Sequence, residues 1–101
     1  MNIAIPSKGR SSNIRTMEIL KGYDKTKIFI FVEPKEYELY LKNYGDFSTI
    51  ININNTDRGI AFVRNYIIDF FNSKNIDYVW IIDDDVTHLH YRYKYNNEKK
   101  Y

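Results

Sequence analysis

The sequence predicts an α/β protein with a mainly parallel sheet. Apolar runs with strand periodicity alternate along the chain with segments in which apolar residues recur at helical spacing. The run before three consecutive aspartates is apolar on both faces, which is typical of a strand in a covered parallel sheet. Right-handed crossovers then place helices on both sides of the sheet. We therefore expect a Rossmann-like, three-layer α/β/α domain over residues 1–101, with strand order 3-2-1-4 and a final edge strand.

Four segments have the β-branched and aromatic content of sheet strands. They lie at residues 2–5, 27–32, 47–53 and 77–82. Pro6 closes the first of them. After the aspartates a period-2 pattern sets an aromatic face against a cationic face, which predicts the edge strand over 88–95. We expect residues 96–101 to be frayed.

Three segments carry helix signals, at residues 13–21, 34–44 and 58–73. Ser11, Ser12 or Asn13 can cap the first helix. Pro34 suits the first turn of the second, and Gly45 follows its end. The stretch NNTD offers several N-cap residues to the third.

Composition excludes several classes of protein. A net charge of +2 with 28% charged residues does not by itself indicate a polyanion-binding protein. The absence of cysteine excludes disulfides and thiolate metal sites. No apolar run approaches the roughly 18 residues of a membrane span, and the N-terminus has a strand pattern rather than a signal peptide. We therefore expect no membrane association and a cytoplasmic location, in a bacterium or, for a phage-encoded chain, its host.

Two polar stretches follow strands that border the predicted switch point of the sheet, where ligands bind in such folds. The loop SKGR follows the first strand and supplies Lys8 and Arg10, with Gly9 permitting close backbone approach. The triplet DDD, residues 83–85, follows the fourth strand. Together, the basic loop and the acidic triplet suit a phosphate-bearing ligand with a divalent metal. The simpler alternatives are an exposed basic loop and a solvated acidic turn.

Within the triplet, persistent strand geometry would direct Asp83 and Asp85 the same way and Asp84 the opposite way. Hard cations such as Mg²⁺ and Mn²⁺ favour carboxylate oxygens shared with substrate phosphates. A D-x-D pair could place one carboxylate on a sugar hydroxyl and the other on the metal. His88 and His90 lie on one face of the edge strand, either as surface residues or as further metal ligands.

The start of the third helix is a candidate anion site, because a helix N-terminus carries unpaired amides and partial positive charge. Arg64 and Asn65 are polar among apolar neighbours there. Arg64 could face the crevice or pair with a nearby carboxylate such as Asp69.

Four motifs then occur in the order seen in the nucleotide-sugar-binding half of GT-A glycosyltransferases: IAIPSKGR, IFIFVEPKEYELY, RGIAFVRNYIIDF and YVWIIDDDV. Over residues 2–86 the chain most resembles the phage and TET-associated type of these enzymes. The resemblance implies half of a GT-A fold. It also implies a nucleotide-diphosphate sugar as ligand and Mn²⁺ or Mg²⁺ as cofactor.

The resemblance assigns roles to individual residues. Glu33 ends the second strand near the base or ribose, and Arg64 approaches the diphosphate. Asp83 and Asp85 match the D-x-D and touch the sugar or ribose and the divalent metal respectively, with Asp83 also a candidate metal ligand. The implied nucleotide-sugar contacts are Pro6, Ser7, Lys8, Arg10, Glu33, Arg64, Asn65, Asp83 and Asp84. Family members continue well beyond the aspartates into an acceptor half, whereas Tyr101 follows Asp85 by sixteen residues. We therefore expect a minimal or truncated domain, and the sequence leaves glycosyl transfer itself open.

The alternative is a small phage-type interaction or inhibitor protein that uses the half-fold to bind a protein or nucleic acid. The exposed edge of an incomplete sheet favours pairing with another chain, and the strand at 88–95 would then make a homo-oligomer or partner contact. Its tyrosines with Arg92 and Lys94 could also stack bases and hold phosphates. A metal-dependent phosphatase or nuclease is the weakest hypothesis, because such sites usually add an acidic residue after the first strand.

Overall fold

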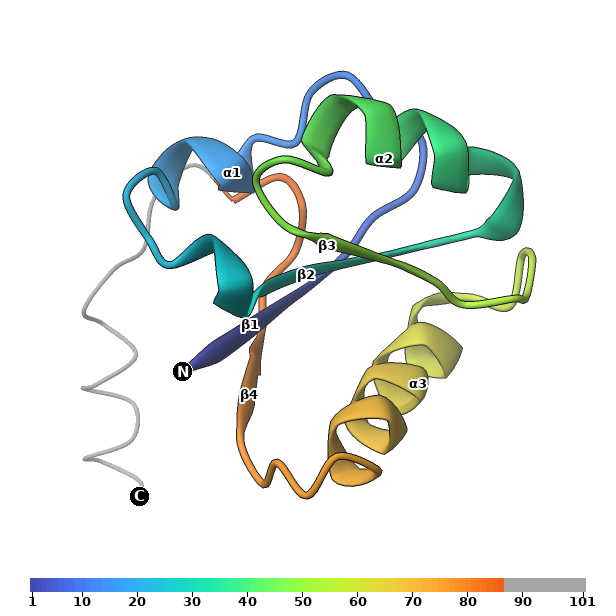
Figure 1. The fold of residues 1–101 in the computed structure, drawn as a ribbon. Coiled ribbons are helices and arrows are strands. Elements are labelled where there is room, and N and C mark those ends of the chain that lie inside the picture. The colour runs from blue at the N-terminus through green and yellow to red at the C-terminus, as the bar shows by residue number, and fades with distance from the viewer. Residues whose placement is uncertain (87–101) are drawn as a thin grey trace, which may run out of the picture.

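The computed structural model describes residues 1–86, which form a four-stranded sheet with three α-helices around it (Figure 1). The elements in chain order are β1 (Asn2–Pro6), α1 (Thr16–Ile19), β2 (Ile28–Val32), α2 (Tyr37–Tyr44), β3 (Thr49–Asn52), α3 (Ile60–Asn72) and β4 (Val79–Ile81). Short 3₁₀ turns at Lys25–Lys27 and Pro34–Glu36 precede β2 and α2. All described strand pairs are parallel and the order is β3-β2-β1-β4, which confirms the predicted sheet.

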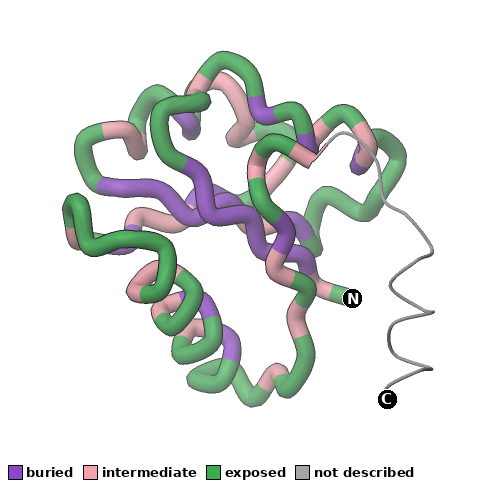
Figure 2. The backbone as a smooth tube through the Cα atoms, turned by 180° about the vertical axis from the view of Figure 1, so that it is seen from behind, coloured by how far each residue is buried: buried purple, intermediate pink, exposed green. Residues whose placement is uncertain are grey.

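Apolar side chains on the two faces of the sheet form two clusters, because successive residues of a strand point to opposite faces. Ile5 and Ile30 are fully buried on the face covered by α1 and α2, together with Tyr40 of α2. On the other face, Phe31 packs against α3 with its ring 5.4 Å from that of Phe70 in an edge-to-face contact. Figure 1 shows α1 and α2 on one side of the sheet and α3 on the other, and Figure 2 shows the buried strands between them. This is the expected three-layer arrangement.

The strand register brings the carboxyl ends of the strands to one level. Pro6 of β1 is paired with Phe31 of β2, and the amide of Ser7 donates to the carbonyl of Phe31 at 3.0 Å. On the outer sides, the amide of Ile53 donates to Val32 at 2.9 Å and that of Ile82 to Ala4 at 2.9 Å. The segments that leave β1, β2, β3 and β4 therefore emerge side by side, and this edge carries the candidate site.

The first helix is shorter than predicted, and the predicted caps are wrong. It spans Thr16–Ile19 rather than 13–21, and its N-cap is Arg15, with no side-chain cap, rather than Ser11, Ser12 or Asn13. Tertiary contacts override the local signal, because Ile14 is buried and its amide donates to the hydroxyl of Tyr44 at 2.8 Å. Residues 11–14 are thereby tied to α2 as a turn.

The third helix begins later than predicted. Its N-cap is Gly59, at φ +89°, and no side chain of the NNTD stretch caps it. Asn54 and Asp57 have positive φ, and the amide of Asp57 donates to the carboxylate of Glu33. The loop is therefore held by β2 instead of capping the helix.

The fourth strand is an edge strand within the described sheet. The sequence predicted burial on both faces, but β1 pairs with β4 on one side only, and Trp80 is 52% exposed. Its neighbour Tyr78 is 76% exposed. The predictions for 88–95, for His88 and His90 and for 96–101 lie outside the described residues and stay predictions.

Among residues 1–86, no helix is long and apolar enough to cross a membrane.

Adjacent residues on α3 allow a test of the packing. Ile67 is completely buried, whereas Ile68 is 45% exposed. We expect Ile67→Ala to lower the free energy of unfolding by about 2–5 kcal/mol, because it leaves a cavity between α3 and the sheet. The matched control Ile68→Ala should change it by no more than about 0.5 kcal/mol. Urea unfolding followed by circular dichroism measures both, and equal losses would contradict the assigned face of α3.

Candidate functional site

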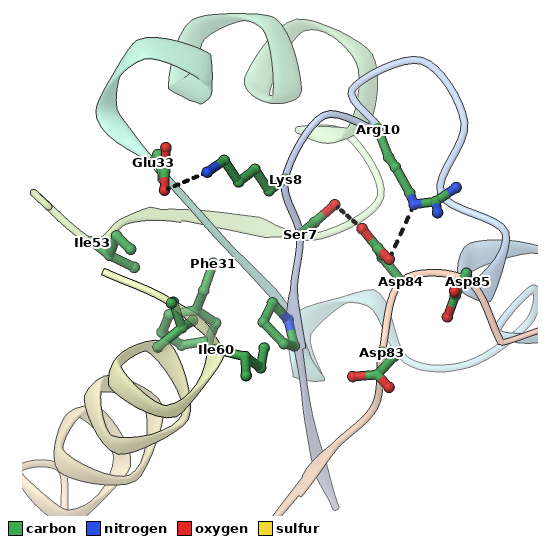
Figure 3. A pocket seen from close by; sticks show the side chains of 13 residues that line it. Ser7, Lys8, Arg10, Phe31, Glu33, Ile53, Ile60, Asp83, Asp84 and Asp85 are labelled. Atoms are coloured by element: carbon green, nitrogen blue, oxygen red, sulfur yellow. Dashed lines mark hydrogen bonds and ion pairs between the residues drawn. The ribbon is translucent and has the colours of Figure 1, made fainter. Parts of the chain in front are cut away.

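A cavity of about 390 Å³ lies at the carboxyl ends of the strands, between the residues that follow β1 and β4 and the start of α3. Its size falls within the range of small-molecule sites, and it sits at the point where the strand order reverses. The predicted meeting of the SKGR loop and the DDD triplet is thus observed (Figure 3). The lining residues are Pro6, Ser7, Lys8, Arg10, Phe31, Glu33, Ile53, Gly59, Ile60, Val63, Asp83, Asp84 and Asp85.

The central aspartate of the triplet is bound to the loop that follows β1. The hydroxyl of Ser7 donates to Oδ2 of Asp84 at 2.7 Å, and Nε of Arg10 lies 3.3 Å from Oδ1. Figure 3 shows the Asp84 carboxylate turned toward these two residues. The side chain of Asp84 is only 14% exposed, so its charge is compensated by protein groups.

A hydrogen-bond chain connects Asp84 to α2. Because Ser7 has one hydroxyl proton and gives it to Asp84, the hydroxyl of Tyr40, at 2.7 Å, must donate to Ser7. The amide of Arg10 in turn donates to the Tyr40 oxygen at 3.0 Å. Burial raises the pKa of Tyr40, so the phenol keeps its proton at neutral pH. The chain therefore fixes Ser7 and Arg10 relative to the acidic turn.

Thr16, a buried residue of α1, holds the backbone of the acidic turn. Its hydroxyl donates to the carbonyl of Asp83 and accepts the amide of Val86 at 3.0 Å. Its own amide donates to the carbonyl of Asp84 at 3.3 Å. The strand ends at Ile81 and the aspartates lie in this turn, so the expected alternation of strand side chains does not extend to them.

Lys8 joins the end of β2 to the loop before α3. Its ammonium lies 2.5 Å from Asp57 and 3.6 Å from Oε2 of Glu33. The hydrogen bond between Lys8 and Asp57 raises the pKa of Lys8 and lowers the pKa of Asp57. Glu33 is 5% exposed; its Oε2 also accepts the Asp57 amide at 2.9 Å, and its Oε1 is buried with no hydrogen-bond partner among the described residues. In this conformation Glu33 holds the loop that borders the cavity.

The first aspartate is bound from the opposite side. Arg64 of α3 donates to Oδ1 of Asp83 at 3.3 Å, and both side chains are about half exposed. Arg64 thus pairs with Asp83, which lines the cavity, rather than with Asp69, although Arg64 itself is not one of the lining residues. Asn65, the next residue, is exposed and does not line the cavity.

The third aspartate is the remaining carboxylate of the triplet. Asp85 is exposed, lines the cavity, and enters no ion pair among residues 1–86. Within that range no group of three or more acidic or histidine side chains is placed to hold a metal by itself. Mg²⁺ commonly takes one or two carboxylates together with substrate phosphates, and Mn²⁺ favours the same oxygen ligands. Asp85 and Asp83 therefore fit an ion shared with a ligand, and not a closed protein cage.

The charges of the lining favour a cation. Four carboxylates, from Glu33 and the triplet, face two cations, from Lys8 and Arg10. The lining thus has two negative charges in excess, whereas the N-terminus of α3, at Gly59 and Ile60, offers amides that no side chain caps. Such a site can accept an anion together with a divalent cation.

The sequence profile of the family described as TET-Associated Glycosyltransferase matches residues 1–101. The chain belongs to this family. No curated protein and no solved structure matches it. This is the glycosyltransferase type that the four sequence motifs resemble, so the predicted resemblance is confirmed. Membership makes the chain a glycosyltransferase-like domain.

Several residues around the site of this glycosyltransferase-like domain were missed by sequence reasoning. Phe31, Ile53, Ile60 and Val63 form an apolar wall of the cavity, but their spacing indicated only core positions. Tyr40 and Thr16 act through hydroxyl groups that meet the site across long sequence separations. Their burial has no local signal in the chain. Asp57 was noticed only as a possible cap.

The contacts of Thr16 with the acidic turn predict that replacing this residue lowers the stability of the protein. We expect Thr16→Val, which is nearly isosteric, to lower the free energy of unfolding by about 1–3 kcal/mol, because the partly buried amide of Val86 loses its acceptor. Thr16→Ser keeps the hydroxyl and serves as the control, with a smaller loss. Denaturant unfolding measures both. A Thr16→Val protein as stable as the wild type would show that the hydroxyl does not hold the turn.

Proposed function

We propose that this domain binds a nucleotide-diphosphate sugar together with Mn²⁺ or Mg²⁺ in the cavity between the SKGR loop and the aspartates. One observation carries the proposal: the motifs shared with the glycosyltransferase type converge on a single cavity whose lining has two negative charges in excess. A diphosphate is itself anionic, so it enters such a lining favourably only with a cation. Family membership supports a sugar nucleotide as the ligand.

The cavity has two chemically distinct parts for the two parts of such a ligand. Phe31, Ile53 and Val63 offer an apolar surface on which a base or ribose can pack beside Pro6 and Glu33. The uncapped N-terminus of α3 and Lys8 offer amides and positive charge to the phosphates. In this proposal Ser7 and Arg10 border the nucleotide while they hold Asp84.

The acidic turn would receive the metal. Asp83 and Asp85 are the candidate ligands, because Asp84 is bound to Ser7 and Arg10. A divalent ion at this position supplies charge neutralisation for the leaving nucleoside diphosphate. The protein contributes position: Thr16 holds the backbone of the turn, and Asp84 joins it to the loop after β1.

Binding measurements test the proposal directly. In isothermal titration with uridine, guanosine, cytidine and adenosine diphosphates, we expect at least one to bind in the presence of Mn²⁺. Asp85→Asn should weaken that binding by about tenfold or more, because it removes the carboxylate that has no ion-pair partner among the described residues.

Asp77→Asn is the matched control, since Asp77 is also exposed but precedes β4 and does not line the cavity. It should bind as the wild type does. Absence of binding to all four diphosphates, or equal binding by Asp85→Asn and the wild type, would refute the proposed function.

A further inference from the structure

The ion pair of Lys8 and Asp57 is exposed to solvent, and so is that of Arg64 and Asp83. The side chains of Arg64 and Asp83 are 50% and 56% exposed, and a single contact of 3.3 Å joins them. Exposed pairs of this kind contribute little, at most a few-fold in an equilibrium constant. The pair can therefore open without disturbing the core.

The two cations that line the cavity, Arg10 and Lys8, each contact a largely buried carboxylate. Arg10 is paired with Asp84, which is 14% exposed and is also bound by Ser7. Lys8 lies against Glu33, whose side chain is 7% exposed and also holds the Asp57 amide. Removing either cation leaves a carboxylate that is largely buried without its charge partner. The contacts of Arg10 with Asp84 and of Lys8 with Glu33 are therefore unsuited to partner exchange, whereas the exposed contact of Lys8 with Asp57 does not carry that cost.

The carboxylate of Asp83 thus has two candidate partners, Arg64 and the metal, and it cannot bind both at once. Its Oδ1 accepts from Arg64, yet the same carboxylate is a proposed ligand of the metal. A divalent cation attracts the carboxylate more strongly than a guanidinium does, because its charge is twice as large and more compact. Arg64, when released, has a planar fork of donors that matches a phosphate group.

We propose that Arg64 and Asp83 form an exchangeable pair: a divalent cation that binds Asp83 and Asp85 releases Arg64, which then binds the phosphates of the same ligand. This inference rests on the proposed function. In the ligand-free protein Arg64 competes with the metal for Asp83, and Asp83 competes with the phosphates for Arg64. Breaking the pair once serves both ligands, so metal and nucleotide promote each other's binding.

The exchange makes a counter-intuitive prediction about a metal titration without nucleotide. Although Arg64→Met removes a residue of the site, we expect it to bind Mn²⁺ alone about two- to fivefold more tightly than the wild type, because Asp83 has lost its competitor. The electron paramagnetic resonance signal of free Mn²⁺ measures this affinity. Arg64→Lys, which keeps the charge, should bind Mn²⁺ nearly as the wild type does.

The same variants report the coupling when uridine diphosphate, or whichever diphosphate of the four binds, is titrated with and without Mn²⁺. In Arg64→Met, the factor by which Mn²⁺ tightens nucleotide binding should fall by about two- to fivefold or more, since no pair remains to be broken. Arg58→Met is the matched control. Arg58 is exposed just before α3, and it lies 4.4 Å over the ring of Phe62 without an ion pair among the described residues.

The outcomes separate this inference from the proposed function. If the wild type binds Mn²⁺ with nucleotide and Asp85→Asn does not, but Arg64→Met leaves Mn²⁺ affinity and coupling unchanged, the exchange is wrong and the proposed function stands. If the wild type binds no nucleotide with Mn²⁺, both are wrong. Weaker Mn²⁺ binding by Arg64→Met also overturns the exchange, since it would show that Arg64 supports the metal site.

Discussion

The arrangement of the site depends on the contacts that the Asp84 carboxylate makes with Ser7 and Arg10. This carboxylate is the meeting point of the loop after β1, through Ser7 and Arg10, and of the turn after β4, to which it belongs. Through Ser7 and Tyr40 it is also connected to α2. Without these partners a carboxylate that is 14% exposed would have no compensation for its lost hydration. The Asp84 carboxylate therefore holds the SKGR loop and the acidic turn together.

This anchoring divides the three adjacent aspartates by function. Three carboxylates in succession repel one another, and each of the three has different surroundings in the structure. Asp84 is bound within the protein, Asp83 is paired with an exposed arginine, and Asp85 enters no ion pair among the described residues. Groups that are buried and fully bonded determine shape, whereas exposed and weakly bonded groups remain available to a ligand.

The sequence predicts those features of the structure that depend on neighbouring residues along the chain, and it fails for those that depend on distant ones. The strands and their parallel arrangement followed from periodicity and crossover handedness. For the expected order 3-2-1-4, the meeting of the SKGR loop with the aspartates followed from the switch-point rule. The ends of the helices did not follow. Contacts of Ile14 with Tyr44 and of Asp57 with Glu33 replaced the local capping signals, because a hydrogen bond to a distant residue satisfies the same backbone group.

By itself the sequence determined the parallel sheet and the edge at which polar side chains gather, because the pattern of apolar residues decides which face each strand buries. Only the tertiary structure decided which charge faces which. Asp83, Asp84 and Asp85 are chemically identical in the sequence, and their neighbours on α1, α3 and the loop after β1 distinguish them. Those neighbours lie between 19 and 77 residues away along the chain. Electrostatic partners are set by distance in space, which a local pattern does not encode.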